Sequence, residues 1–245
     1  MMRPYPDEVA KTVFNDFYFF DKNFNEKIEA AENGNVDMME QVGLAYLNGQ
    51  DGFEEVDADP VKAAYWMEKA AKNGSRTAIF NIALFYAKGF GVKRDFEKAA
   101  DWMKKAVKDG NQDAVGAEMQ YREAAEAYKK AVAGDPQGQS DYASNLMLLA
   151  NSLDQAGSDA DYKEAIEWAL KAEGKDDGQA DFVLVLAYEH GRGVSINYKK
   201  AAKYYKKGSK KEHMICINNL GRLYFLGEGL PKDLEKAFSL FLKSA

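Results

Sequence analysis

The hydrophobic and polar positions of this chain recur in the same order along its length. One recurring segment places a Lys or Glu before Ala and, in most copies, an aromatic residue, as in residues 62–66, KAAYW. Its copies begin at positions 62, 98, 123, 164, 200 and 236, so the intervals between them are 36, 25, 41, 36 and 36 residues. A period in this range is typical of helical repeat proteins, and we therefore expect stacked copies of one small unit.

A second pattern lies upstream of each segment. It reads Leu-x-Tyr-x-x-Gly and ends at Gly49, Gly89 and Gly191, with a looser form that ends at Gly227. Together the two patterns predict a helix pair in each copy, an A helix that ends at the glycine and a B helix that carries the Lys. A small side chain recurs eight residues after that Lys or Glu, where it lets a neighbouring backbone approach: Ala70, Ala106, Ala131, Ala172, Gly208 and Ser244.

The turn between the A and B helices has its own chemistry. Gly89 suits the left-handed residue that ends a helix, and Asp95 suits the cap that begins the next helix. In the first copy Asp59 supplies the cap, and Pro60 follows at the first helical position. We do not expect these glycines to bind phosphate, because no copy continues to a third Gly or to a Lys-Ser/Thr pair after a strand.

Two copies depart from the pattern. The copy at residues 110–134 is 11 residues short (25 against 36), which predicts one nearly continuous helix over residues 111–132 and a bend of the solenoid there. The first copy carries about four extra residues between Gly49 and Asp59. Their acidic side chains do not have calcium-loop spacing, so we expect a solvated turn.

The composition of the chain argues against several classes of function. The chain has 33 Lys and Arg against 39 Asp and Glu, a net charge of −6 that argues against nucleic acid as the main partner. No apolar stretch approaches the roughly 20 residues that span a bilayer. The single cysteine, Cys216, cannot form an intramolecular disulfide. The first residues lack a signal peptide, so we expect a cytoplasmic protein, or a secreted or periplasmic one if a leader has been removed.

These landmarks resemble the Sel1-like repeat family, a relative of the tetratricopeptide repeats. The family pattern consists of Leu, Tyr, Gly-x-Gly-Val, Asp, Lys-Ala and Trp, and residues 34–245 are similar to it. They contain about six copies of the pattern, and the copy at 110–134 is degenerate. The resemblance implies an all-α fold, a right-handed α/α superhelix whose A helices line a concave surface. It also implies a non-enzymatic scaffold or adaptor that binds another protein or an extended peptide.

The two ends of the chain carry further expectations. Residues 1–33 are expected to form an N-terminal capping region, in which the aromatic residues between Phe14 and Phe24 pack a leading helix onto the first repeat. Burial is favoured there over a ligand-binding aromatic cluster. The last B helix carries Phe238 and Leu242 near its end, which predicts either self-association through the C-terminal edge or a native chain that continues.

The partner-binding surface is assigned to A-helix positions outside the core. Asn amides can pair with a peptide backbone, and Arg222 can hold a carboxylate through two hydrogen bonds. No catalytic residue, cofactor or metal ion is expected, because neither His190 nor His213 has a second ligand at metal spacing. The candidate residues are Asn81, Phe85, Asn145, Asn218, Asn219 and Arg222.

Two other functions stay open. Some members of the family are labelled as acting on penicillin-type compounds, which makes a β-lactam hydrolase one alternative. This chain lacks the disulfide-linked repeats of that subgroup and a Ser-x-x-Lys of the acyl-enzyme type. The other alternative is a basic face that binds an acidic partner or nucleic acid, because residues 198–211 interleave seven lysines with tyrosines. The simpler interpretation of that stretch is a solvated helix face.

Overall fold

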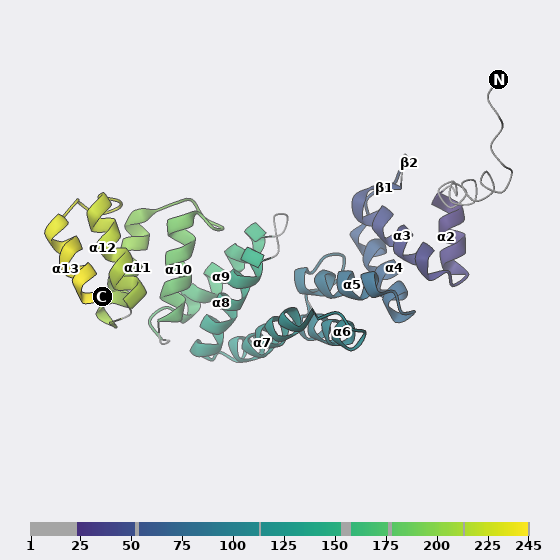
Figure 1. The fold of residues 1–245 in the computed structure, drawn as a ribbon, viewed down its shortest axis with the longest axis horizontal. Helices are drawn as coiled ribbons and strands as arrows, with labels where there is room; N and C mark the ends of the chain where they lie inside the picture. Colours follow the sequence, from purple (N-terminus) through teal and green to yellow (C-terminus); the bar gives the residue numbers. More distant parts are fainter. Residues whose placement is uncertain are drawn as a thin grey trace, which may run out of the picture. The chain divides into compact units, whose positions relative to one another are not determined.

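A computed structural model of the chain describes residues 24–51, 54–112, 114–152, 158–175, 178–212 and 214–244, without the side chains of residues 51–55, 152 and 158 (Figure 1). The aromatic residues expected to pack between positions 14 and 23, and His213, lie outside these ranges. The helices are α2 (Phe24–Glu32), α3 (Val36–Asn48), α4 (Pro60–Lys72), α5 (Arg76–Lys88), α6 (Phe96–Lys108), α7 (Ala114–Val132), α8 (Pro136–Ser152), α9 (Ser158–Ala172), α10 (Gln179–His190), α11 (Tyr198–Lys210), α12 (Met214–Leu226) and α13 (Leu234–Ser244).

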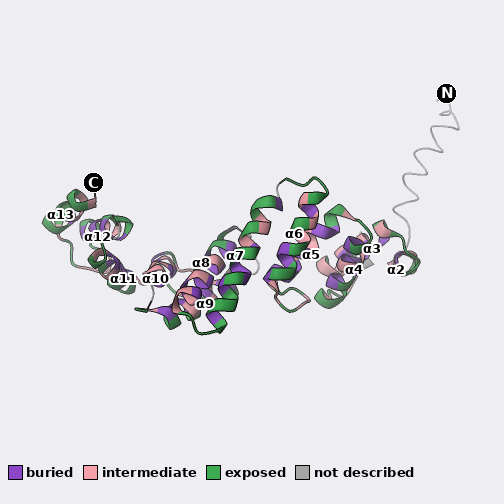
Figure 2. Ribbon diagram, turned by 90° about the horizontal axis from the view of Figure 1, so that it is seen from below, coloured by how far each residue is buried: buried purple, intermediate pink, exposed green. Residues whose placement is uncertain are grey.

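The helices pair in the predicted order of A followed by B. α3 packs on α4, α5 on α6, α8 on α9, α10 on α11, and α12 on α13. The leading helix α2 packs on α3, and the ring of Phe24 meets Tyr46 edge-on at 5.3 Å between centroids. Buried residues, mainly Ala with larger aliphatic and aromatic side chains, lie along the faces between helices (Figure 2). The predicted all-α repeat fold is confirmed.

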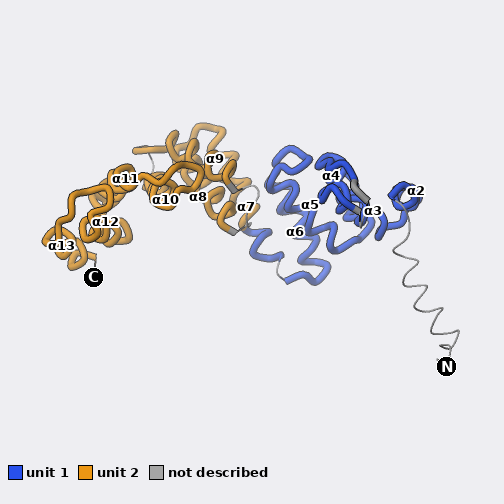
Figure 3. The backbone as a smooth tube through the Cα atoms, turned by 90° about the horizontal axis from the view of Figure 1, so that it is seen from above, with its two compact units in different colours: residues 1–119 blue, residues 120–245 orange. Residues whose placement is uncertain are grey.

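The chain divides into two compact units, residues 1–119 and residues 120–245 (Figure 3). The division falls inside α7, the helix of the copy predicted to be degenerate. α7 has 19 residues, so a long helix does replace the missing turn, although it begins at Ala114 and not at residue 111. The start is later because the N–H of Asn111 donates to the carbonyl oxygen of Ala106 at 3.0 Å and so closes the end of α6.

The helix ends have the predicted chemistry. Gly89 has a φ of 69°, in the left-handed region, and its N–H donates to the carbonyl oxygen of Phe85. The side chain of Asp95 then accepts the N–H of Lys98 at 3.0 Å and caps α6. Asp59 caps α4 in the same way and is followed by Pro60 at the first helical position. The predicted caps are therefore confirmed in these copies.

The second glycine of the A-to-B turn joins one copy to the copy before it. Gly91 has a φ of 66°, and a Cβ atom added to it would overlap the carbonyl oxygen of Pro60 at the start of α4. Gly229 meets the carbonyl group of Tyr198 at the start of α11 in the same manner. Each turn therefore lies against the N-terminus of the preceding B helix so closely that only glycine fits. Sequence reasoning assigned a role to the first glycine alone.

Two landmarks of the repeat contact each other. The ammonium group of the Lys in each KA segment lies over the ring of the Tyr in the A helix of the same copy, a cation–π arrangement. The distances to the ring centroid are 4.9 Å for Lys62 and Tyr46, 4.9 Å for Lys98 and Tyr86, 4.5 Å for Lys200 and Tyr188, and 4.8 Å for Lys236 and Tyr224.

The extra residues of the first copy form a short hairpin and not a plain turn. The strands β1 (Gln50–Asp51) and β2 (Glu54–Glu55) pair antiparallel, with Gln50 opposite Glu55. The N–H of Val56 closes the hairpin by donating to the carbonyl oxygen of Gly49 at 3.1 Å. The insertion is long enough for its backbone groups to satisfy one another, which the expectation of a solvated turn did not include.

Candidate protein-binding surface

A groove of about 470 Å³ crosses the A-helix surface of the second unit. It runs between α7, α8 and α10, so it is formed by A helices of two successive copies together with the helix that precedes them. Its one large apolar side chain is Leu148, which is 49% exposed. The lining residues are Glu123, Glu126, Ala127, Lys130, Asp141, Ser144, Asn145, Leu148 and Gln179.

Asn145 lies in the wall of this groove, as predicted for a partner-binding residue. Its side-chain amide donates to the carbonyl oxygen of Asp141, one turn earlier in α8, at 3.0 Å. The carboxylate of Asp141 in turn accepts a hydrogen bond from the side chain of Gln137 at 2.9 Å. These contacts hold the side chains of α8 in place. The groove has three carboxylates against one Lys, so it favours a cationic partner.

Phe85 is a correction to the predicted set. The structure buries it, with 6% of its surface exposed, and its ring meets Phe90 edge-on at 5.1 Å. The reason is the way α5 ends, because the N–H of Phe90 donates to the carbonyl oxygen of Phe85 and folds the following residue back over the last turn. A hydrophobic contact of this kind accompanies many left-handed helix ends. Asn81, on the same helix, is half-buried.

Arg222 is already paired within the molecule. Its guanidinium forms an ion pair with the buried carboxylate of Glu189 in α10 and lies 3.5 Å from the carboxylate of Glu228. The hydroxyl of Tyr205 in α11 donates to the same Glu189. Burial raises the pKa of Tyr205 to about 12, so its hydroxyl remains a donor at neutral pH. Arg222 therefore joins α12 to α10 and is not a free carboxylate-binding group.

The two predicted asparagines of α12 also face different surroundings. Asn218 is exposed and its amide donates to the hydroxyl of Ser244 in α13 at 3.4 Å, whereas Asn219 is half-buried. The six candidate residues are thus spread over both units. Of these six, Asn145 alone lines the groove.

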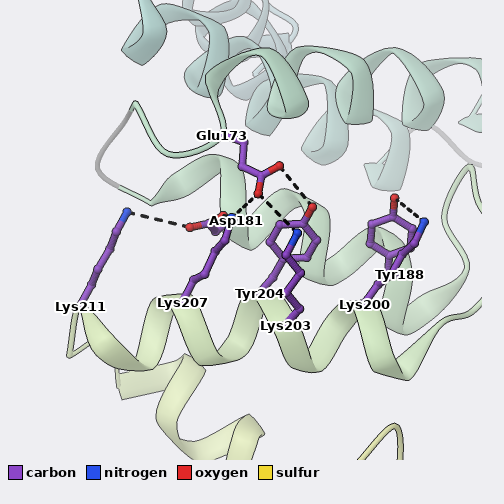
Figure 4. Close-up of polar contacts among 8 residues, drawn as sticks. All are labelled: Glu173, Asp181, Tyr188, Lys200, Lys203, Tyr204, Lys207 and Lys211. Carbon is purple, nitrogen blue, oxygen red and sulfur yellow. Dashed lines mark hydrogen bonds and ion pairs between the residues drawn. The ribbon is translucent and has the colours of Figure 1, made fainter.

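A second polar cluster connects the turn after α9 with α10 and α11 (Figure 4). Glu173 accepts hydrogen bonds from Lys207 and, at 3.4 Å, from the hydroxyl of Tyr204. Lys207 also lies 3.5 Å from the buried carboxylate of Asp181, and Lys211 lies 3.9 Å from it. The hydrogen bond from Lys207 is the main cause that lowers the pKa of Glu173. Charges that the sequence alone did not connect therefore hold α10, α11 and the turn after α9 together.

In the described parts of the chain, no group of three or more His, Cys, Asp or Glu residues is placed to hold a metal ion. None of the helices there is both long and apolar enough to cross a membrane. His190 is half-exposed, and burial lowers the pKa of its imidazole, with the charge of Arg192 adding to the effect.

The family profile of the Sel1 repeat matches the chain five times, over residues 36–75, 77–111, 136–176, 184–213 and 215–245. The chain belongs to the Sel1 repeat family. The profile passes over residues 112–135, where the structure has the long helix α7. Sel1 repeat proteins generally mediate protein–protein interactions, and the family is typically a non-catalytic scaffold.

Two curated proteins are similar to part of this chain. A sel1-like repeat-containing protein of Acanthamoeba polyphaga mimivirus is 41% identical over 68 residues, which cover 28% of this chain and 12% of that protein. A chitin synthase regulator of Saccharomyces cerevisiae is 35% identical over 88 residues, which cover 34% of this chain and 13% of the regulator. The matches thus span about an eighth of the length of these relatives.

Two solved structures are similar along most of the chain. One is a protective antigen of uropathogenic Escherichia coli that displays an SLR fold, with 23% identity, a TM-score of 0.39, and coverage of 90% of this chain and 56% of the antigen. The other is a Sel1 repeat protein from Oxalobacter formigenes, with 25% identity, a TM-score of 0.41, and coverage of 90% and 65% respectively.

Alignment of the Sel1 repeats on the glycine that ends each A helix locates the charged residues that sequence reasoning missed. Arg222 stands where the other copies have Leu44, Leu84 and Leu186, five residues before that glycine. Glu189 stands where a Sel1 repeat of the first unit has Ala87. Asp181 replaces an apolar residue in the same way: the equivalent positions hold Met39, Ile79 and Ile217. A charge at a position that is apolar in the other copies was the available signal.

Proposed function

We propose that this protein is a non-enzymatic scaffold or adaptor that binds another protein or an extended peptide on its A-helix surface. The observation that carries the proposal is the groove of about 470 Å³ that α7, α8 and α10 form in the second unit. The groove lies on A helices of two successive copies. The chain belongs to a family whose members generally mediate protein–protein interactions.

The side chains of the groove indicate the kind of peptide it takes. Leu148 offers half-exposed apolar surface, and Glu123, Glu126 and Asp141 provide negative charge around it. An extended segment that alternates Lys or Arg with an apolar residue would place its charges on the carboxylates and its apolar side chain on Leu148. The amide of Asn145 can pair with the peptide backbone.

The experiment is a selection of displayed peptides on the purified chain, followed by affinity measurement of the selected peptides against two variants. Leu148→Glu places a charge in the groove. Leu170→Glu is the matched control, because Leu170 is a leucine of similar exposure (45%) on α9 that does not line the groove. We expect the first variant to lose at least about tenfold in affinity and the control to retain it.

If the selected peptides bound the Leu148→Glu variant as tightly as the unchanged chain, the assignment of the groove as the binding site would be wrong. Selected sequences rich in Asp and Glu would contradict the charge argument. Measurement of β-lactam turnover by the purified chain separates the scaffold from the hydrolase alternative, and we expect none above the rate in buffer.

The face of α13 favours a second interaction, association with another copy of the chain. Leu234, Phe238 and Leu242 form a stripe at helical spacing and are 54%, 65% and 64% exposed. In other copies the positions equivalent to Phe238 hold the buried residues Ala64, Ala100 and Ala202. Sedimentation velocity over a range of concentrations tests this proposal. A dimer that Phe238→Glu converts to monomer supports it, and a monomer at every concentration rejects it.

A further inference from the structure

The seven lysines between positions 199 and 211 do not all have the same contacts. α11 has 3.6 residues per turn, so lysines spaced by three or four lie along a common stripe. One stripe contacts the preceding copy and the other lies directly beside it, so that Lys203 and Lys207 border both the ion pairs and the exposed surface. The structure gives these two stripes different surroundings, and therefore different uses.

The stripe that contacts the preceding copy is already neutralised (Figure 4). Lys203 and Lys207 form ion pairs with Glu173, and Lys207 and Lys211 form ion pairs with Asp181. Lys200 lies over the ring of Tyr188. These lysines stabilise the packing of α11 on the preceding copy. Three of the seven lysines remain: Lys199, Lys206 and Lys210.

Lys199, Lys206 and Lys210 are exposed and have no carboxylate partner at ion-pair distance among the described residues, although the ammonium group of Lys206 lies 5.9 Å from the ring centroid of Tyr224 in α12. They line a depression of about 340 Å³, which we term the lysine groove. Its floor is apolar, formed by Ala202 of α11 and by Leu230. The full lining is Lys199, Ala202, Lys203, Lys206, Lys207, Lys210 and Leu230.

Leu230 reaches this groove because of the glycine turn that precedes α13. Gly229 has a φ of 68°, and its close approach to the carbonyl group of Tyr198 lays the turn against the start of α11. The groove is therefore a product of packing between two copies and is not merely a row of surface lysines.

The chemistry of the groove favours an acidic protein segment over nucleic acid. Single-stranded nucleic acid needs exposed aromatic side chains on which its bases stack. The structure buries Tyr204 and Tyr205, which are 5% and 2% exposed and pack toward α10. The groove thus combines positive charge with an aliphatic floor.

We propose that the lysine groove binds an extended acidic segment of a partner protein, with carboxylates on Lys199, Lys206 and Lys210 and an apolar side chain over Ala202 and Leu230. Residues 199 and 210 are separated by about 16 Å along the helix, at a rise of about 1.5 Å per residue. About five residues of extended chain cover that distance. This site lies on a B helix, so it is independent of the A-helix groove and takes a partner of opposite charge.

The test uses fluorescence anisotropy with a fluorescein-labelled peptide of sequence EDELEDE and the full chain. We expect binding that weakens as salt is added, because exposed charges are screened. The triple variant Lys199→Glu, Lys206→Glu and Lys210→Glu should lose at least about tenfold in affinity. The matched control is Lys93→Glu, Lys104→Glu and Lys108→Glu, which makes the same charge change at exposed lysines of the first unit.

Four outcomes decide the proposal. Loss in the first triple variant with retention in the control supports it, and weaker binding of a peptide in which Gly replaces the central Leu supports the apolar floor. Equal loss in both triple variants would show that net charge alone attracts the peptide, and would overturn the site. Tighter binding of a uridine octanucleotide than of the peptide, lost in the first variant only, would overturn the choice of partner. The Leu148→Glu variant should bind the acidic peptide normally, which separates this test from that of the A-helix groove.

Discussion

The A helices α5 and α10 occupy equivalent places in the two units, but they keep their positions by different means. α5 buries Ile79 and Ala87, and its contacts with α6 are largely apolar. At the same two positions α10 buries the carboxylates of Asp181 and Glu189. A buried carboxylate is costly unless it is paired, and each of these has a cation from a neighbouring helix, Lys207 and Arg222.

The difference shows what the repeat fold requires at these positions. It does not require an apolar side chain, only that whatever is buried there has a partner in the adjacent helix. Apolar copies can pack on any apolar neighbour, whereas a charged copy depends on one residue in a particular place. The second unit therefore gains specificity between its copies, and a change in either member of a pair should be more harmful there.

The largest expected effect comes from placing the carboxylate of α10 into α5. Ile79→Asp should lower the free energy of unfolding by about 3–5 kcal/mol, because Ile79 is fully buried and a carboxylate there loses its hydration, although both Arg76 and Asp109 line the depression next to it. Adding Asp109→Lys supplies the cation that Lys211 provides in the second unit, and should recover at least about 1 kcal/mol. Urea denaturation followed by circular dichroism measures both. A loss below about 1 kcal/mol for the single variant would contradict the expected cost of a carboxylate at this position.

The next effect comes from removing the cation of the second unit. Arg222→Leu restores the residue type of the other copies but leaves Glu189 buried without its cation, and we expect a loss of about 2–3 kcal/mol. The double variant Arg222→Leu and Glu189→Gln should recover most of it, since the neutral amide still accepts the hydroxyl of Tyr205. The same denaturation experiment applies. A double variant that is no more stable than the single one would refute the pairing.

The smallest effect concerns pH. The hydrogen bond from Lys207, opposed in part by burial, holds the pKa of Glu173 below its ordinary value. A carboxylate with a lowered pKa stabilises the folded state above its unfolded pKa, near 4.5, and this contribution is lost as the pH falls through the lower folded value. Glu173→Gln should therefore cost no more than about 1 kcal/mol at pH 7, and this cost should shrink as the pH falls toward 3. Glu167→Gln, an exposed change on α9, serves as the control. An equal cost at both pH values would exclude ionisation as the cause.

The sequence predicted the elements of this protein well because their signals are local. The left-handed glycines and the Asp and Asn caps act within four residues of the helix end they define, and the 36-residue interval reports one stacked copy after another. The long helix α7, with 19 residues, could be predicted because the missing turn is visible in the spacing of the repeats. The four extra residues of the first copy were also evident, but their hairpin was not.

The candidate surface could be predicted only in part. Asn145 was assigned to the binding surface from its position on an A helix and does line the groove. Phe85 was assigned by the same reasoning and is buried, because Phe90 folds back over it after the helix ends. Arg222 was predicted to be free to bind a partner, but it forms an ion pair with Glu189 of α10, which lies 33 residues earlier in the chain (222 against 189). The helical period indicates which residues lie on the same face of a helix, but not which side chains of another copy cover that face.

The sequence by itself determined the family, the helix pairs, their ends and the irregular copy, since all of these depend on residues close together in the chain. The tertiary structure decided which lysines of α11 are neutralised, which glycine touches the preceding copy, and which carboxylates are buried. The physical reason is distance along the chain: Lys207 and Glu173 are 34 residues apart, and only stacking of successive copies brings their charges together.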